Sequence, residues 1–490
     1  MKKLTFILLL SVFTGITFSG YSQDCPSASL IFYDQSEIDA FAVNYPNCTQ
    51  IDGIIRIGGP PTGVITNLNG LSALQHVGAH VYIENNKHLK SLEGLNNLET
   101  IGLHLIIKGC DSLESLQGLN SLTSVGALYN GDMVIEANKT LTELSGLENL
   151  SSLAKDLIIT KNVDLLTLHG LEGLTTLSGK VIITENKALQ TLEGLESLTY
   201  VSGDMVIKDN LKLVSTKGLD MLSHIGGDLI LRNQPLMMSL SGETARNDSP
   251  ALDNLQVVDG EIRISNNALL QNLNGLQNLN QTGSFIRISS NPNLQQLNGF
   301  QNLNAVEALR IEHNKDLHTL QGFESLETIR DYLLITGNHS LTSLDGFEGL
   351  LPETLQSLYV ANNHSLSDCA VESLCDYLID QVGEAYFANN SGGCSSIEDV
   401  MDACFTALPG EISVKALMLF PNPASEKIYI QGLPEGMKLH KVQISNHTGQ
   451  LVREVDHPAY EIDIQNLSPG MYFFSLEVGE RLVQKKVVIK

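Results

Sequence analysis

The chain has 490 residues, of which 55 are acidic and 30 basic, giving a formal net charge of −25, and it contains no tryptophan. This charge argues against nucleic-acid binding, because phosphate contacts need a basic face. The length exceeds one ordinary hydrophobic core, although an array of repeats needs no single core.

Residues 1–22 have the pattern of a secretory signal peptide. Lys2 and Lys3 precede the apolar segment Leu4–Ile16, and small residues lead to an expected cleavage before Gln23. The apolar segment is too short for a membrane span, and no other stretch of the sequence could form one. We therefore expect an exported protein with no transmembrane segment after cleavage.

The cysteines fit an exported protein with disulfide bonds near the two ends of its central part. Zinc binding by the last four is the alternative, but they lack the close Cys-x-x-Cys spacing of zinc modules. The sequence leaves several pairings open at the C-terminal end. The preferred pairs are Cys25–Cys48, Cys369–Cys394 and Cys375–Cys404.

Residues 23–50 are expected to form an N-terminal cap that contains a helix. Ser36 and Asp39 have the spacing of a capping box, and Ile38, Phe41 and Ala42 would share an apolar helix face. Such a cap would cover the first strand edge of a repeat array and prevent it from pairing with another chain.

Residues 51–363 repeat a unit of about 24 residues, seen most clearly at Val181–Asp204. Each unit has an apolar–x–apolar strand, then an asparagine, regularly spaced leucines and a glycine. A fixed period of this length is the signature of a solenoid. Parallel strands must be joined by crossovers, so we expect a right-handed coil with a parallel sheet.

The asparagine of each unit is predicted to be structural and not ligand-binding. A carboxamide both donates and accepts hydrogen bonds, so it can satisfy buried backbone groups of a turn. Cys110 shares the position and is expected to be an inert core thiol. The position holds Asn86, Cys110, Asn138, Asn162, Asn186, Asn210, Gln234, Asn267, Asn291, Asn314, Asn338, Asn363 and Asn390.

Two insertions interrupt the period, near Ala127–Asp132 and within Glu243–Asn254. Loops of this kind carry function more often than the scaffold does. A neutral surface insertion is the simpler interpretation of each.

Residues 364–404 are expected to form a C-terminal cap. It would contain a helix near Ala370–Ile379, a last strand at Ala385–Asn390, and a second helix that begins at Ser396.

Residues 405–415 have the composition of a linker, and residues 416–490 form a separate domain. Short strand-like segments separated by turns predict a small antiparallel β-sandwich there. These segments are Lys427–Ile430, Lys441–Ser445, Glu461–Ile464, Tyr472–Glu477 and Leu482–Ile489.

The repeat unit resembles leucine-rich repeats and, more closely, bacterial versions of the receptor L-domain found in insulin and growth-factor receptors. The Gly-Leu-x-x-Leu, apolar–x–apolar and asparagine elements carry this resemblance, together with the cysteine-containing caps. The resemblance covers about Cys25–Cys404 and implies the solenoid fold.

The C-terminal segment resembles the type A sorting domain of the type IX secretion system of Bacteroidetes. This resemblance implies contact with the secretion machinery, passage through the outer membrane, removal of the domain, and release or surface attachment. It is carried by Pro421, Asn422, Pro423, Gly470, Tyr472, Lys485 and Lys486, and by the segment His447–Leu451.

No catalytic, cofactor-binding or metal-binding motif is present, so no enzymatic activity is expected. The candidate ligand-binding residues are those at the centre of each strand, which point outward. An exposed apolar stripe and plain β-propensity are equally good explanations of the aliphatic ones. The candidates are Ile158, Ile182, Val206, Arg263, Arg287 and Arg310.

Three consecutive arginines repel one another unless carboxylates or an anion separate them. Neutralisation by Glu261 and Glu312 is the simpler interpretation, and a site for an anionic glycan or a carboxylate is the alternative. Asp132, Asp156 and other acids precede the strands; a calcium site needs several converging oxygens, so we interpret this row as a solvated edge.

The sequence therefore predicts a secreted or surface-displayed recognition or adhesion protein that binds a protein or glycan through the sheet face of its solenoid. A polysaccharide-degrading enzyme on a β-helix scaffold and a passive spacer are the alternatives.

Overall fold

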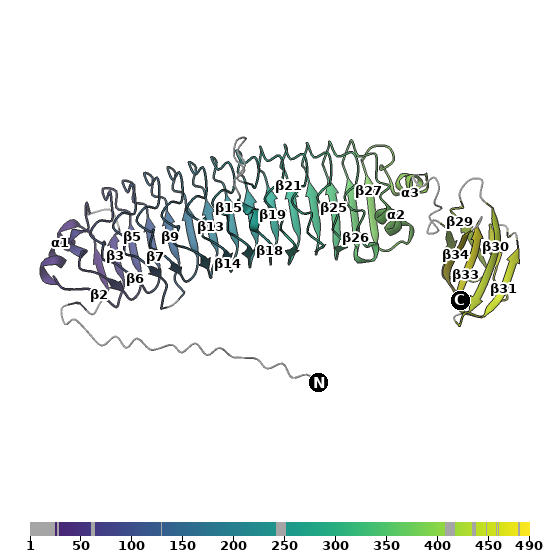
Figure 1. Ribbon diagram of the computed structural model, residues 1–490, viewed down its shortest axis with the longest axis horizontal. Coiled ribbons are helices and arrows are strands. Elements are labelled where there is room, and N and C mark those ends of the chain that lie inside the picture. The colour runs from purple at the N-terminus through teal and green to yellow at the C-terminus, as the bar shows by residue number, and fades with distance from the viewer. Residues whose placement is uncertain are drawn as a thin grey trace, which may run out of the picture.

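The computed structural model describes residues 25–26, 29–59, 64–128, 130–241, 251–406, 417–433, 438–446, 448–456, 458, 460–478 and 481–490. A long solenoid precedes residue 407, and a smaller β-domain follows residue 416 (Figure 1). The expected signal peptide, residues 407–415 of the expected linker, residues 243–250 of the second insertion and His447 lie outside the described residues.

One parallel sheet of 15 strands runs along the solenoid, as the sequence predicted (Figure 1). Its strands come from successive coils, and equivalent residues of neighbouring repeats are register partners. The strands are β1 (Leu30–Phe32), β3 (Ile55–Gly58), β5 (Val81–Glu84), β7 (Leu105–Lys108), β9 (Met133–Glu136), β11 (Leu157–Thr160), β13 (Val181–Thr184), β15 (Met205–Lys208), β17 (Leu229–Arg232), β19 (Ile262–Ser265), β21 (Ile286–Ser289), β23 (Leu309–Glu312), β25 (Tyr332–Thr336), β26 (Ser357–Ala361) and β27 (Glu384–Ala388). We call this the broad sheet.

The broad sheet begins earlier than the sequence indicated. Strand β1 lies in the segment that was expected to be only a cap, and it pairs in parallel with β3. At the other end, β27 corresponds to the expected last strand.

Short strands of two residues line the opposite side of the coils in three narrower sheets. The first contains β2 (Gln50–Ile51), β4 (His76–Val77), β6 (Thr100–Ile101), β8 (Ser124–Val125) and β10 (Ser152–Leu153). The second contains β12 (Thr176–Leu177), β14 (Tyr200–Val201), β16 (His224–Ile225), β18 (Val257–Val258) and β20 (Gln281–Thr282). The third contains β22 (Ala305–Val306) and β24 (Thr328–Ile329), and the 3₁₀ turns are η1 (Asn69–Leu71), η2 (Leu252–Asn254) and η3 (Pro352–Thr354).

Leucines from every coil fill a continuous core between these sheets. Leu189, Leu192 and Leu195 have no exposed surface. The glycine of the unit is needed where the chain turns: Gly194 has a φ of +116°, and a Cβ there would lie 2.1 Å from the carbonyl oxygen of Leu168 in the preceding coil. Only glycine combines this backbone conformation with so close an approach.

The asparagine ladder makes the hydrogen bonds that its chemistry predicts. The Nδ2 of Asn186 donates to the carbonyl oxygen of Ile159 at 2.9 Å, and its Oδ1 accepts from the backbone N–H of Asn162 at 3.0 Å. The preceding residue, Glu185, has a φ of 58°. Non-glycine residues adopt this left-handed conformation at a cost of roughly 1–2 kcal/mol, which the ladder hydrogen bonds offset.

Cys110 lies in the ladder as expected. It is fully buried, and its backbone N–H donates to the Oδ1 of Asn138 at 3.0 Å. Burial raises the pKa of its thiol to about 11. The thiol therefore stays protonated at neutral pH and does not act as a nucleophile.

The N-terminal helix is α1 (Gln35–Asn44), and its capping differs from the prediction. The capping box is formed by Asp34 and Glu37, not by Ser36 and Asp39, because only a carboxylate as long as that of glutamate reaches back to the N-cap backbone. Ile38 and Phe41 are buried as expected, but Ala42 is exposed.

Disulfides close both ends of the solenoid. Cys25–Cys48, Cys369–Cys394 and Cys375–Cys404 are the pairs that the sequence favoured. At the C-terminal end Cys375–Cys404 joins α2 (Glu372–Ile379) to α3 (Ile397–Thr406), and Cys369–Cys394 joins the segments that precede these helices. The Oγ of Ser396 accepts from the N–H of Asp399 at 3.1 Å, which matches the predicted start of α3.

The C-terminal domain has two antiparallel sheets, which confirms the predicted sandwich. One contains β28 (Met418–Phe420), β29 (Lys427–Gln431) and β32 (Glu461–Asp463). The other contains β31 (Leu451–Asp456), β30 (Leu439–Asn446), β33 (Gly470–Val478) and β34 (Arg481–Ile489). The sequence missed β28 and β31, and β31 is an edge strand with no buried residue, so it lacks the apolar alternation that identifies strands.

Candidate functional site

The outward face of the broad sheet is open to solvent. In the described part of the chain, α1 lies at one end of the solenoid, α2 and α3 lie at the other, and none of them covers this face (Figure 1). The central residue of each strand points outward, while its two strand neighbours are buried in the core. The candidates Ile158, Ile182 and Val206 are direct register partners and are half-buried.

The aliphatic stripe is longer than these three residues. It runs without interruption over six strands, because each central residue is paired with the next. Contiguous apolar surface of this kind on a soluble protein marks an interaction site more often than single exposed apolar residues do. The stripe consists of Ile106, Val134, Ile158, Ile182, Val206 and Ile230.

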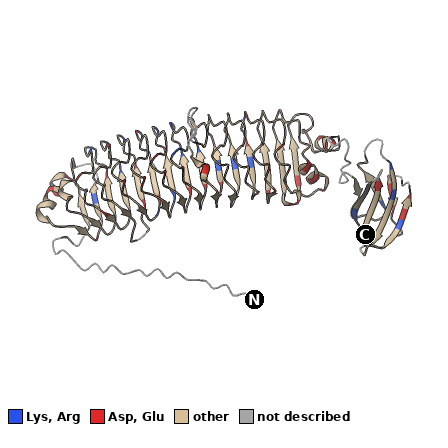
Figure 2. Ribbon diagram, viewed as in Figure 1, with Lys and Arg blue, Asp and Glu red and all other residues tan. Residues whose placement is uncertain are grey.

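The arginine row continues the stripe over the next three strands. Arg263, Arg287 and Arg310 are register partners, and Figure 2 shows basic residues on consecutive strands of the broad sheet. The guanidinium of Arg263 makes two hydrogen bonds with Glu261, at 2.9 and 2.6 Å. This bidentate pair neutralises the first arginine.

The other two arginines share one carboxylate. Arg310 Nη2 donates to Glu312 Oε1 at 2.9 Å, and Arg287 Nε lies 3.0 Å from Glu312 Oε2. The second contact is an ion pair without hydrogen-bond alignment, so Arg287 Nε, Arg310 Nε and Glu312 Oε2 have no hydrogen-bond partner among the described residues. The row therefore has three cations for two carboxylates.

Glu312 stabilises the charged form of Arg310. Burial by itself would lower the pKa of the Arg310 guanidinium, but the hydrogen bond and the charge of Glu312 outweigh it and raise this pKa above its usual value. The side chain of Glu312 is only 9% exposed and lies in contact with both guanidinium groups. The result is a fixed carboxylate between two partly paired guanidinium groups.

The row of acids before the strands is not the solvated edge that the sequence suggested. Asp156 Oδ1 accepts from the backbone N–H of Lys180 at 2.8 Å, and Asp228 Oδ1 accepts from that of Glu261 at 2.8 Å. A Cβ at Gly260 would lie 2.3 Å from Asp228 Oδ1, so the glycine makes room for the carboxylate of the preceding coil. The repeated Gly–acid pairs in the sequence were the signal for this bonding.

Aromatic side chains extend the central row toward the C-terminal cap. Tyr359 and Tyr386 stack with ring centroids 4.7 Å apart and are each about half exposed. At the other end, the guanidinium of Arg56 lies 4.5 Å from the ring centroid of Tyr82 and also pairs with Glu84. The sheet face thus changes character along its length, from aromatic to aliphatic to basic and back to aromatic.

The first insertion borders a polar groove of about 420 Å³. The lining includes Asn130, Ser151 and Ser152, and Leu128 next to it is 61% exposed. Within the described ranges no three His, Cys, Asp or Glu side chains gather as a metal site would require, and no helix is long and apolar enough to cross a bilayer.

In the C-terminal domain, the expected sorting-motif residues meet at the last strand. Asn422 lies between Pro421 and Pro423, its Oδ1 accepts from the N–H of Val488 at 2.9 Å, and its Nδ2 donates to the carbonyl oxygen of Lys486 at 3.1 Å. The Asn-Pro segment is thereby fixed onto β34.

The remaining motif residues lie on the two strands that pair there. Gly470 opens β33 opposite Ile489, and Tyr472 is buried with its hydroxyl donating to the carbonyl oxygen of Ser468 at 2.9 Å. Lys485 and Lys486 are on β34, opposite Phe474 and Phe473. The motif is a structural signature of the domain's closing hairpin.

Comparison with known proteins agrees with this interpretation of the C-terminal domain. Residues 418–490 match the family model described as a secretion system C-terminal sorting domain. Among solved structures, a leucine-rich repeat protein from Bacteroides ovatus is 13% identical, with a TM-score of 0.32, over 64% of this chain and 76% of that chain. No curated protein matches the chain significantly.

The solenoid and the β-domain therefore have different roles: one offers an open sheet face, and the other carries the secretion signature. The chain bears a C-terminal sorting domain of the type IX secretion system, which directs it to a secreted or cell-surface location.

Proposed function

We propose that this protein is a non-catalytic recognition or adhesion protein that binds an extracellular protein or glycan through the outward face of the broad sheet. The observation that carries the proposal is the open, in-register central row, in which six aliphatic residues are followed by three arginines. Parallel sheets usually have both faces covered, so an exposed face that carries a row of aliphatic residues followed by a row of arginines is unusual.

The arginine row adds a preference for anionic groups. Three guanidinium groups and two carboxylates leave one positive charge on a chain whose net charge is −25. Arginine forms paired hydrogen bonds with carboxylates and sulfates, and a guanidinium has more N–H donors than the single contact that Arg287 or Arg310 makes with Glu312 uses. A ligand carboxylate at the outer side of the row would complete their coordination.

The proposal that the protein is not an enzyme rests on the shape of the face. Across the described residues its coils are short and nearly uniform, so no long described loop rises beside the central row to form the wall of a cleft. The arginines and glutamates of the row are committed to one another as ion pairs. Catalytic groups need a concave site in which a substrate is held against them.

The arginine row can be tested with charge changes in both directions. We expect Arg287→Gln/Arg310→Gln to weaken retention on an immobilised polyuronate by about tenfold, which corresponds to roughly 1.4 kcal/mol. Glu312→Gln removes the competing carboxylate and should strengthen retention. The measurement is the affinity of the full chain for the polymer, with the polymer length followed in parallel to detect cleavage.

Two further variants control this experiment. Arg330→Gln removes an exposed arginine outside the central row and should leave retention unchanged. The triple variant Arg287→Gln/Arg310→Gln/Glu312→Gln leaves no unpaired buried carboxylate and separates lost binding from lost stability. Equal retention by this triple variant and the native chain contradicts an anion site, and shortening of the polymer contradicts the non-catalytic role.

A further inference from the structure

A second surface, separate from the sheet face, lies at the corner where each coil leaves the asparagine ladder. The first, second and fourth residues after the ladder residue point outward there. In most coils they are polar, for example Lys87, His88 and Lys90 in an early coil and Lys315, Asp316 and His318 in a late one. Five consecutive coils depart from this rule.

In these five coils, from the one containing Asn162 to the one containing Asn267, the corner carries apolar side chains. Leu166, Met238, Leu211 and Leu269 are 40%, 50%, 38% and 36% exposed. Such values are high for large apolar residues in a solenoid whose core leucines have almost no exposed surface. We call the surface formed by Leu166, Leu211, Val214, Leu236, Met238 and Leu269 the corner strip.

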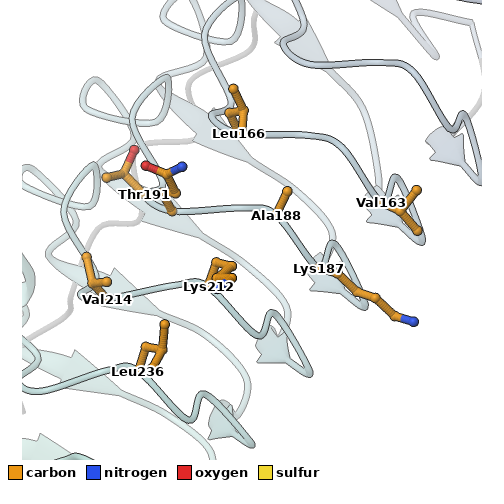
Figure 3. Close-up of a pocket in the computed structure, with 9 residues that line it drawn as sticks. Val163, Leu166, Lys187, Ala188, Thr191, Lys212, Val214 and Leu236 are labelled. Atoms are coloured by element: carbon orange, nitrogen blue, oxygen red, sulfur yellow. The ribbon is translucent and has the colours of Figure 1, made fainter.

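The corner strip contains a groove of about 540 Å³. Its walls come from four successive coils, and Figure 3 shows Leu166, Val214 and Leu236 on the same side of neighbouring coils, with Ala188 between them. A groove of this size with apolar walls is typical of a binding site for a partner side chain.

Two exposed lysines border the groove. Lys187 and Lys212 line it, and within the described part of the chain neither ammonium group lies within 4.0 Å of a carboxylate. Most other cations of the solenoid are paired, as Lys180 is with Asp204 at 2.7 Å. Apolar walls with unpaired cations at the rim complement a partner that is apolar along one side and acidic beside it.

The backbone hydrogen bonds of the corner strip favour a helix over an extended strand as its partner. Gln190 N–H donates to the carbonyl oxygen of Leu166 at 3.0 Å, and Met238 N–H donates to that of Val214 at 3.2 Å. These coil-to-coil bonds leave no free ladder to which an extended strand could add. A helix satisfies its own backbone and binds through side chains at i, i+3, i+4 and i+7.

The length of the strip sets the length of its partner. Its five coils span four spacings of about 4.8 Å, or roughly 19 Å. A helix rising 1.5 Å per residue covers this distance in about 13 residues. We propose that the corner strip is a docking site for an acidic amphipathic helix of a partner protein.

Residues 242–250 of this chain, which follow the coil of Gln234 in the sequence, have too few apolar residues to form the apolar side of such a helix. Their sequence, GETARNDSP, offers a single alanine as its only apolar side chain other than proline. The occupant is therefore sought in another protein.

The probe is a synthetic peptide of about 14 residues with leucines along one helical face and glutamates beside them. We expect the full chain to bind this peptide and not a version with lysines in place of the glutamates. Lys187→Glu/Lys212→Glu should weaken binding by about tenfold, and Leu166→Ser/Met238→Ser by at least as much. These residues are exposed or half-exposed, so the fold should tolerate the changes.

Matched controls are available in the same chain. Lys315→Glu changes the residue equivalent to Lys187 in a coil with a polar corner, and Leu128→Ser removes an exposed leucine elsewhere; neither should alter binding. The proposal is overturned if the acidic peptide does not bind at roughly millimolar concentration, or if the control variants weaken binding as much as the strip variants. Retention of the native chain, but not of Leu166→Ser/Met238→Ser, on zwitterionic phospholipid vesicles would instead identify a lipid surface and overturn it too.

Discussion

Replacing Asn186 with alanine is expected to lower the free energy of unfolding of the solenoid by about 3–5 kcal/mol. The side chain is fully buried, and its removal leaves the carbonyl oxygen of Ile159 and the N–H of Asn162 without their partners. Each orphaned buried group costs roughly 1–3 kcal/mol, and the lost side chain leaves a cavity besides.

The measurement is chemical denaturation of the full chain, followed by circular dichroism. Asn97→Ala is the matched control, because Asn97 also donates to a backbone carbonyl of the preceding coil, that of Ser72 at 2.8 Å, but does so on the surface. We expect it to cost less than about 1 kcal/mol. If both variants unfold at the same denaturant concentration, the ladder is not what stabilises the coils.

Removing residues 418–490 is expected to abolish export of the chain across the outer membrane. These residues carry the family match, and they fold around a core of their own. The fraction of the protein in the medium and on the cell surface, compared with the fraction retained inside, measures the effect. Normal surface delivery of the truncated chain would show that the signal lies elsewhere.

A point variant tests whether export needs the Asn-Pro segment fixed in place or only the presence of the domain. Asn422→Ala removes the two hydrogen bonds that fix the Asn-Pro segment on β34, and we expect it to reduce export several-fold. Glu461→Ala removes only an exposed ion pair with Lys427 and should have no effect, because solvent screens exposed ion pairs and they contribute little to stability.

Much of the fold could be predicted because the repeat states the same rule many times. Asn186 and Gly194 each have equivalents at the same place in nearly every coil. This repetition distinguishes the ladder and the turn from a chance pattern at one position. The helix cap at Asp34 occurs only once, and Ser36 and Asp39 have nearly the same spacing. The spacing in the sequence did not show that Asp34 and Glu37, the pair with the longer acidic side chain at its second position, form the capping box.

The parts that escaped prediction depend on contacts between coils. Strand β31 is defined by its partner β30 and carries no apolar pattern of its own. Asp156 looks like a solvated acid in the sequence, and only the stacked coils show that its carboxylate holds the N–H of Lys180. The corner strip also arises from stacking, since Leu166 and Leu236 come from coils three repeats apart in the chain and line the same groove.

The sequence located the candidate site as far as it showed which residue of each strand points outward. The order of Ile158, Ile182, Val206 and the arginines follows from alternation within each strand. The sequence predicted the ion pairs only because the glutamates are close to the arginines along the chain. Only the structure shows that Arg287 and Arg310 share Glu312.

The central claim is that the outward face of the broad sheet binds the ligand. The most direct measurement is retention of the full chain on a panel of extracellular polysaccharides and matrix proteins, compared with that of Ile158→Thr/Ile182→Thr/Val206→Thr. Threonine keeps the β-branched shape that suits a strand while making the stripe polar. The account predicts that at least one material retains the native chain intact and releases this variant, whereas the control Leu128→Ser is retained. Equal retention of the native chain and both the threonine and Arg287→Gln/Arg310→Gln/Glu312→Gln variants on every material would contradict it.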